Sequence, residues 1–141
     1  MADRSLVTGG AGFIGSNLVR ALLGEGSEVV VLDDLSTGSR ENLAEVSDDV
    51  RWIEGSILDD SALREAMEGV QRVFHLAAQV SVPASMQDPS YNDAVNCRGT
   101  QSVLEAARAA GVGRVVYSAS CAVYGNAPGP VSYTHLRAHE T

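Results

Sequence analysis

The pattern that most constrains the fold of this chain is a regular alternation of short β-branched runs with stretches of helical periodicity. Helical patterns cover residues 13–23, 61–68 and 91–110, and each is followed by a glycine. The runs between them are apolar at successive positions, which is typical of strands covered by helices on both faces of a parallel sheet. They are SLVT (5–8), EVVVLD (28–33), VRWIE (50–54), RVFHLA (72–77) and RVVYS (114–118). The sequence therefore predicts an α/β fold with five parallel strands.

Length and composition are those of one folded domain. The 141 residues suffice for one hydrophobic core, and 45% of them are hydrophobic. No apolar run approaches the roughly 18 residues of a membrane span, and the first residues lack the apolar core of a signal peptide. The net charge of −8 argues against nucleic acid or an anionic membrane as a partner. We expect a cytoplasmic protein.

The two cysteines, Cys97 and Cys121, form neither a disulfide framework nor a metal-binding pattern, because no Cys-x-x-Cys motif is present. Both are predicted to be buried as small hydrophobic residues, and no metal site is expected.

A glycine-rich stretch, TGGAGFIG (8–15), follows the first predicted strand and opens the first predicted helix. It fits Gly-x-Gly-x-x-Gly on Gly10, Gly12 and Gly15, or Gly-x-x-Gly-x-x-Gly on Gly9, Gly12 and Gly15. In either spacing one glycine permits a tight turn, Gly12 lets the backbone approach a pyrophosphate, and Gly15 lets the helix pack on the sheet. The phosphates would then meet free N–H groups at the helix N-terminus.

Asp33 ends the second predicted strand and lies eighteen residues beyond Gly15. A carboxylate there accepts hydrogen bonds from both ribose hydroxyls of an adenosine and repels a 2′-phosphate. Asp34 is better explained as a solvated loop residue, and Arg40 is the one cation that softens a preference for NAD. The sequence therefore predicts a Rossmann-type doubly wound sheet that binds NAD rather than NADP.

Several motifs in order make the chain resemble the extended short-chain dehydrogenase/reductases. They are TGGAGFIGSNL (8–18), LDDLSTGSRENL (32–43), HLAAQVSVPAS (75–85), VNCRGT (95–100) and YSASCAVYG (117–125). Within that group the chain is similar to the NAD-dependent epimerase/dehydratase family and its UDP-glucose 4-epimerase-like branch. The resemblance covers residues 5–128.

This resemblance implies contacts with NAD. The pyrophosphate is expected beside the glycine loop, the adenosine beside the loop after the second strand, and the ribose and nicotinamide beside the later strand ends. The residues so implicated are Gly9, Gly12, Phe13, Ile14, Gly15, Asp33, Asp34, Ser36, Thr37, Gly38, Ser56, Ile57, Leu76, Ala77, Ala78, Asn96 and Ser118. Ser120 matches the family's Ser/Thr that hydrogen-bonds the reacting sugar hydroxyl and is the predicted catalytic residue.

Three positions need a separate interpretation. Ser56 stands where the family usually has an acid that contacts the adenine amino group, so this contact is weakened. His75, at the end of a buried strand, is interpreted as a structural histidine bonded to backbone rather than as an acid or base. Cys121 has no neighbouring base and is interpreted as a packing residue.

The resemblance also shows what the chain lacks. The family's Tyr-x-x-x-Lys dyad lowers the tyrosine pKa so that a phenolate removes the sugar hydroxyl proton. None of the four tyrosines is followed four residues later by a lysine, and the sequence contains no lysine. Arginine in the Tyr133 to Arg137 spacing cannot replace the compact ammonium group. The family's sixth strand and nucleotide-sugar domain are also missing from the sequence, so the sheet is expected to be truncated after the fifth strand.

The last eleven residues, VSYTHLRAHET (131–141), resemble the translation of one reading frame of a transposon-end adapter used in sequencing libraries. We interpret residues 1–130 as an incomplete NAD-binding Rossmann domain and residues 131–141 as a translated adapter tail.

The function predicted for the parent protein is NAD-dependent epimerisation of a nucleotide sugar, a UDP-sugar by the resemblance. A nucleotide-sugar 4,6-dehydratase and a non-catalytic NAD(H)-binding sensor are the alternatives. The residues ASCAV (119–123) contain no carboxylate, which favours the epimerase over the dehydratase. The chain as written is expected to be inactive and poorly soluble, and the resemblance implies a homodimer for the parent.

Overall fold

The structure, a computed structural model, describes residues 3–120 and 123. Its centre is a five-stranded parallel sheet in the order β3-β2-β1-β4-β5. The strands are β1 (Arg4–Thr8), β2 (Glu28–Asp33), β3 (Val50–Glu54), β4 (Arg72–His75) and β5 (Arg114–Tyr117). The predicted Rossmann-type α/β fold is confirmed, and the bounds of β2 and β3 agree with the sequence prediction.

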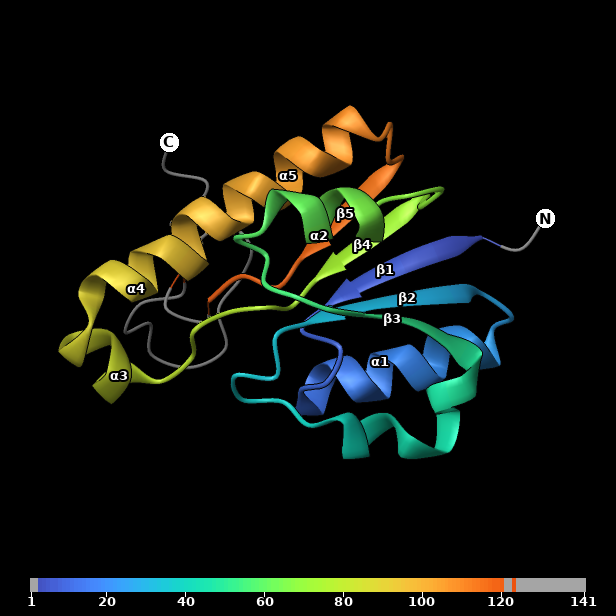
Figure 1. Ribbon diagram of the computed structural model, residues 1–141, viewed down its shortest axis with the longest axis horizontal. Helices are drawn as coiled ribbons and strands as arrows, with labels where there is room; N and C mark the ends of the chain where they lie inside the picture. The colour runs from blue at the N-terminus through green and yellow to red at the C-terminus, as the bar shows by residue number, and fades with distance from the viewer. Residues whose placement is uncertain (1–2, 121–122, 124–141) are drawn as a thin grey trace.

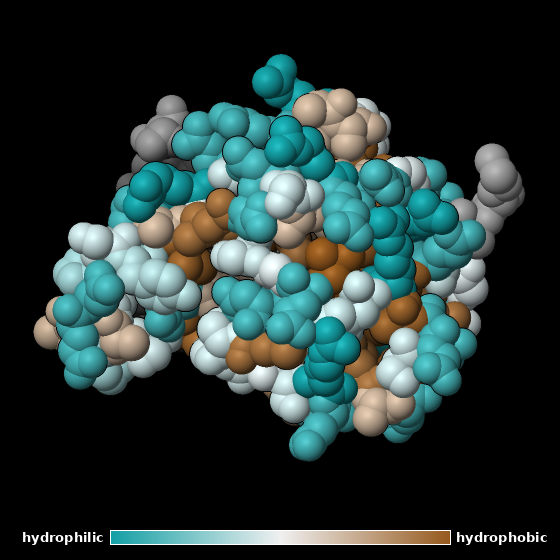
Figure 2. All heavy atoms as spheres, in the orientation of Figure 1, coloured by the Kyte–Doolittle hydropathy of each residue, from teal (hydrophilic) through white to brown (hydrophobic). Residues whose placement is uncertain are grey.

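Helices cover the sheet on both faces (Figure 1). On one face lie α1 (Phe13–Gly24) and the 3₁₀ segment η1 (Arg40–Asp49). On the other lie α2 (Asp60–Ala66) and α5 (Thr100–Ala109). On the face seen in Figure 2, polar side chains predominate and apolar ones show between the helices.

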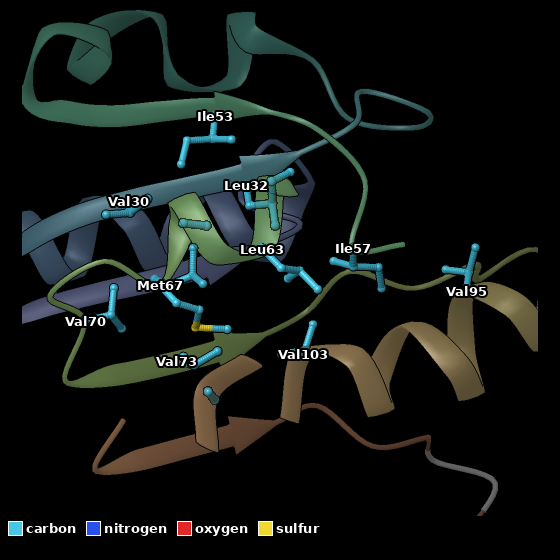
Figure 3. Close-up of a cluster of buried hydrophobic side chains, with 14 residues drawn as sticks. Val30, Leu32, Ile53, Ile57, Leu63, Met67, Val70, Val73, Val95 and Val103 are labelled. Atoms are coloured by element: carbon cyan, nitrogen blue, oxygen red, sulfur yellow. The ribbon is translucent and has the colours of Figure 1, made fainter. Parts of the chain in front are cut away.

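Two hydrophobic clusters hold these layers together because successive side chains of β2 point to opposite faces. Val30 and Leu32 join the cluster under α2 and α5, whereas Val29 and Val31 join the cluster under α1. Figure 3 shows the first cluster, in which Leu63 and Met67 of the α2 region meet residues of the sheet and Val103 of α5.

The outer strands do not have the burial predicted from their apolar sequences. In β3 only Ile53 is buried, and Val116 and Tyr117 of β5 are 45% and 53% exposed. Both strands lie at the borders of the described sheet, where a neighbouring strand is present on one side only.

The helix predicted over residues 91–110 is three segments: α4 (Pro89–Asp93), a π-helix η2 (Ala94–Gly99) and α5. The start is earlier than predicted because Asp88 caps α4 and accepts a hydrogen bond from the Tyr91 N–H. A further helix, α3 (Val82–Gln87), and η1 were not predicted. The α3 and α4 helices lie together at one end of the sheet, at the left of Figure 1.

Two sequence-based interpretations, that of Cys121 and that of the 131–141 tail, concern residues outside the described ones. Among the described residues, no group of three His, Cys, Asp or Glu side chains is placed to hold a metal ion. No helix in this part of the chain has the length and apolar character needed to cross a membrane.

Candidate functional site

The candidate site lies where the direction of strand addition changes. From β1 the chain adds β2 and β3 on one side and then crosses to add β4 and β5 on the other. In open α/β sheets a crevice opens at the carboxyl ends of the strands at this point, and ligands bind there. The glycine loop, the loop after β2 and the segment after β4 all follow strand ends at this edge of the sheet.

The glycine loop packs too closely for side chains at three of its predicted positions. Gly9 has φ of +71°, and a Cβ there would lie 2.8 Å from the Ala77 backbone nitrogen. A Cβ on Gly15 would lie 2.1 Å from the Gly9 carbonyl oxygen. A Cβ on Gly10 would lie 2.7 Å from Val31 Cγ1 in the core. Of the loop glycines, Gly9 alone has a positive φ. The tight turn is therefore made at Gly9, in the second of the two predicted spacings.

The loop delivers the chain into the N-terminus of α1. Gly12 is the N-cap and, as a glycine, supplies no side-chain hydrogen bond to the first turn. The first N–H groups of a helix have no partner within it, and they carry partial positive charge. Phe13 and Ile14 are 84% and 64% exposed beside them. Backbone N–H groups at this end of α1 suit a phosphate.

Asp33 connects β2 to the glycine loop. It is buried, with 8% exposure; its Oδ2 accepts the Ala11 N–H at 2.9 Å and its Oδ1 the Leu35 N–H at 2.8 Å. Leu35 has a positive φ of 58°. A carboxylate has about four acceptor positions, so these two bonds orient Asp33 and leave acceptor capacity for hydroxyl donors.

The rest of this loop is more open. Asp34 is exposed and accepts a hydrogen bond from the Ser36 N–H at 3.0 Å, as predicted for a loop residue. Ser36 and Thr37 are exposed, while a Cβ on Gly38 would lie 2.8 Å from the Ala11 carbonyl carbon. Gly38 therefore lets the loop lie directly against the glycine loop.

Asn42 is a residue of this region that the sequence interpretation did not single out. Its Nδ2 donates to the Ala11 carbonyl at 2.7 Å, and the Ser39 N–H donates to the same oxygen at 3.2 Å. Together with Asp33 these contacts satisfy both polar groups of the Ala11 backbone. The position of Asn42 within the quoted 32–43 motif was the available signal.

Arg40, the cation considered for a 2′-phosphate, is engaged elsewhere. Its Nη2 donates to Glu54 Oε2 at 2.9 Å, and its guanidinium lies 4.7 Å from the centre of the Trp52 ring. Glu54 is the register partner of Asp33 on the neighbouring strand.

Ser56 and Ile57, after β3, differ in their surroundings. Ser56 is half-buried, and its Oγ accepts the Leu58 N–H of its own turn at 3.2 Å. Ile57 is 5% exposed and lies in the core, where it touches Gly99 of the π-helix. Ile57 thus supports the strand end through packing.

The segment after β4 is held by side chains. Thr8 Oγ1 accepts the N–H groups of Leu76 and Ala77, each at 3.3 Å. Asn96 clamps Gln79: its Oδ1 accepts the Gln79 N–H at 2.8 Å, and its Nδ2 donates to the Gln79 carbonyl at 2.9 Å. Ala78 between these anchors is exposed.

His75 is structural, as predicted, but its partners are hydroxyl groups and not backbone. It is 2% exposed, with Nδ1 2.7 Å from Thr8 Oγ1 and Nε2 3.0 Å from Thr100 Oγ1. Its ring stacks on Tyr117 with centroids 5.6 Å apart. Burial lowers the pKa of His75 from 6.5 to about 4.

Ser118 and Ser120 follow β5 at the same edge of the sheet, and both are exposed. The Ser118 N–H donates to the His75 carbonyl at 3.2 Å, and the Ser120 carbonyl accepts the Val123 N–H at 3.2 Å. The structure thus brings Ser118 next to the end of β4.

Cys97 was predicted to be buried, and this prediction was wrong. Its side chain is exposed on η2. A hydrogen bond to Asp93, aided by the charge of that carboxylate, raises the pKa of the Cys97 thiol. The buried residues of this region, Val95, Gly99 and Val103, recur every four residues. Cys97 lies midway between Val95 and Gly99, on the opposite side of the helix.

Residues 5–140 match the model of the NAD dependent epimerase/dehydratase family. The chain belongs to this family. It is 50% identical over 129 residues to a UDP-glucose 4-epimerase of Mycolicibacterium smegmatis. The matched region covers 89% of this chain and 41% of that protein.

Two solved structures illustrate the likeness in three dimensions. A UDP-glucose 4-epimerase from Brucella ovis in complex with NAD superposes with a TM-score of 0.86 at 39% identity, covering 96% of this chain and 41% of that one. DesIV, a dTDP-glucose 4,6-dehydratase from Streptomyces venezuelae with NAD and TYD bound, gives 0.83 at 42% identity, covering 90% and 42%. The chain spans about two fifths of the length of these relatives.

Proposed function

We propose that this chain binds NAD at the carboxyl ends of β1, β2 and β4, as the cofactor-binding part of a UDP-glucose 4-epimerase-type enzyme. The observation that carries the proposal is the joint geometry of the glycine loop and Asp33. Gly9 and Gly15 leave no space for a Cβ, the N-cap of α1 is a glycine without a capping side chain, and Asp33 is oriented by two backbone N–H groups. These features fit a pyrophosphate beside an adenosine ribose.

Each part of the site has a proposed task. The backbone of residues 12–15 holds the pyrophosphate, and Asp33 accepts the ribose hydroxyls and disfavours a 2′-phosphate. The pairing of Arg40 with Glu54 and Trp52 supports NAD over NADP, because its guanidinium is already engaged. Residues 76–78 line the cofactor, with Asn96 fixing the end of that segment through Gln79.

The chemistry of the parent enzyme is proposed from its relatives. NAD supplies a hydride acceptor and donor when bound. Ser120 is proposed to hydrogen-bond the sugar hydroxyl at the reacting carbon and so to orient it for proton removal. The proton acceptor expected from the family is the tyrosine of a Tyr-x-x-x-Lys dyad, which this sequence does not contain.

The dehydratase remains the second enzymatic candidate because DesIV is as similar to the chain as several epimerases are. The absence of a carboxylate in residues 119–123 favours the epimerase. A non-catalytic NAD(H) sensor is distinguished by the genomic sequence that follows residue 130. A Tyr-x-x-x-Lys pair there supports an enzyme, and its absence supports the sensor.

We further propose that the parent is a cytoplasmic homodimer acting on a UDP-sugar, with no nucleic-acid or membrane partner. The chain as written should bind NAD without interconverting UDP-glucose and UDP-galactose. Measurable interconversion by the purified chain would refute this statement.

The test compares two neighbouring carboxylates. Asp33→Asn removes a buried acid that contacts the glycine loop, whereas Asp34→Asn removes an exposed one that bonds only its own turn. NAD affinity, measured by titration calorimetry, should fall about tenfold or more for Asp33→Asn, the loss expected for a charged hydrogen-bond acceptor. Asp34→Asn should change it less than about threefold. Equal effects would contradict the proposed ribose contact.

A further inference from the structure

His75, the last residue of β4, occupies the centre of a hydrogen-bond network that runs from β1 to α5. Thr8 at the end of β1 lies on its Nδ1 side, and Thr100 at the start of α5 lies on its Nε2 side. The Thr100 hydroxyl also donates to the Asn96 carbonyl at 2.8 Å. This hydrogen-bond network therefore links β1, which leads into the glycine loop, to the π-helix η2.

The donor and the acceptor of each hydrogen bond in this network follow from the other bonds that Thr8 and Thr100 make. Thr8 Oγ1 accepts the Leu76 and Ala77 N–H groups, so its one proton is available for His75 Nδ1. The Thr100 proton is directed to Asn96, so Thr100 Oγ1 accepts from Nε2. All groups are satisfied when His75 is neutral and carries its proton on Nε2.

A protonated ring would break this arrangement. With hydrogen on both nitrogens, His75 could no longer accept from Thr8, and the Thr8 hydroxyl proton would lose its partner. Burial acts in the same direction, since it lowers the pKa of His75 to about 4. Tyr117, stacked on the ring, is the titratable residue of β5 that faces it.

The two ends of this hydrogen-bond network, Thr8 and Asn96, hold the same segment after β4. Thr8 fixes Leu76 and Ala77 directly after β4, and Asn96 fixes Gln79 three residues after Leu76. Gly9, next to Thr8, packs directly against the Ala77 backbone. Residues 76–79, the proposed cofactor wall, are thus held by the Thr8 and Asn96 side chains. Thr8 contacts His75 directly, and Asn96 is linked to it through its backbone carbonyl and Thr100.

We propose that His75 is a positioning residue for the cofactor site: as the neutral Nε2–H tautomer it links Thr8 to Thr100 and so fixes residues 76–79 and the Asn96 turn. This inference rests on the proposed binding of NAD for its functional consequence. Its structural content, the tautomer and the restraint of residues 76–79, stands without ligand.

The first experiment uses the unaltered chain. Two-bond ¹H–¹⁵N correlation spectra of histidine-labelled protein distinguish the Nε2–H from the Nδ1–H tautomer. We expect His75 as the Nε2–H form without titration between pH 8 and 5. An Nδ1–H form, or titration near pH 6.5, overturns the proposal.

The second experiment removes one link. Thr100→Val keeps the shape but not the hydroxyl, Thr100→Ser restores the hydroxyl, and Ser102→Ala is a hydroxyl deletion further along α5. Thr100→Val should speed hydrogen exchange of the Ala77 and Gln79 amides and weaken NAD binding about tenfold, the effect of one lost buried hydrogen bond. Thr100→Ser should recover most of both, and Ser102→Ala should resemble the unaltered chain.

The outcomes separate the two proposals. Faster amide exchange in Thr100→Val with no NAD binding by the unaltered chain would refute the proposed function and support the positioning role. Unchanged exchange and affinity in Thr100→Val, or no recovery in Thr100→Ser, would overturn the positioning role. If Thr100→Val does not fold, the tautomer in the unaltered chain decides.

Discussion

Acidification should destabilise this protein through His75 in a defined pH window. The ring is 2% exposed, and its pKa is lowered by burial from 6.5 to about 4. Between these values the unfolded chain binds a proton at this histidine and the folded chain does not. The unfolded state therefore gains stability as the pH falls.

The size of the effect follows from the difference of about 2.5 between the two pKa values. At about 1.4 kcal/mol for each pH unit, His75 contributes about 3 kcal/mol that is present above pH 6.5 and lost by about pH 4. This is a large part of the stability of an ordinary domain, which is about 5–15 kcal/mol.

Urea unfolding followed by circular dichroism at several pH values between 4 and 8 measures this contribution. Carboxylates also titrate in this range, so the comparison is with His75→Gln, which keeps every other group. The unaltered chain should lose about 3 kcal/mol more than His75→Gln over the window. Parallel pH dependences, or an NMR titration of His75 near 6.5, would refute the reasoning.

Three further predictions concern the loop and the sheet border. Gly15→Ala places a Cβ 2.1 Å from the Gly9 carbonyl oxygen and should cost about 1–3 kcal/mol in urea unfolding and abolish NAD binding, whereas Gly24→Ala, with nothing within 4 Å, should do neither. Asn42→Ala removes a 2.7 Å bond to the glycine loop and should cost about 1 kcal/mol by the same unfolding assay and weaken NAD binding in calorimetry. Val116→Lys should reduce self-association in sedimentation velocity, because Val116 is 45% exposed on the bordering strand; unchanged association would exclude this surface.

The parts of the fold that were predictable from sequence are those set by local pattern. The EVVVLD run predicted the bounds of β2 correctly because both faces of that strand are buried. The glycine-rich stretch predicted the turn before α1. Asp33 was identified from its place at the end of the second predicted strand, eighteen residues after Gly15. Its hydrogen bond with the Ala11 N–H was not predicted.

Contacts between distant segments could not be predicted from pattern. The partners of His75 are 67 and 25 residues away in sequence, and no periodicity encodes them. Cys97 was predicted to be buried from its residue type, but the helix buries Val95, Gly99 and Val103 and leaves Cys97 exposed on the other side. The register of Asp33 with Glu54, which brings Arg40 to its ion pair, likewise arises only when the strands assemble.

Calorimetric titration of the purified chain with NAD and with NADP tests the central claim most directly. The account predicts saturable binding of one NAD per chain, and binding of NADP that is at least about tenfold weaker because Asp33 repels the 2′-phosphate. No saturable binding of NAD, or binding of NADP as tight as that of NAD, would contradict it.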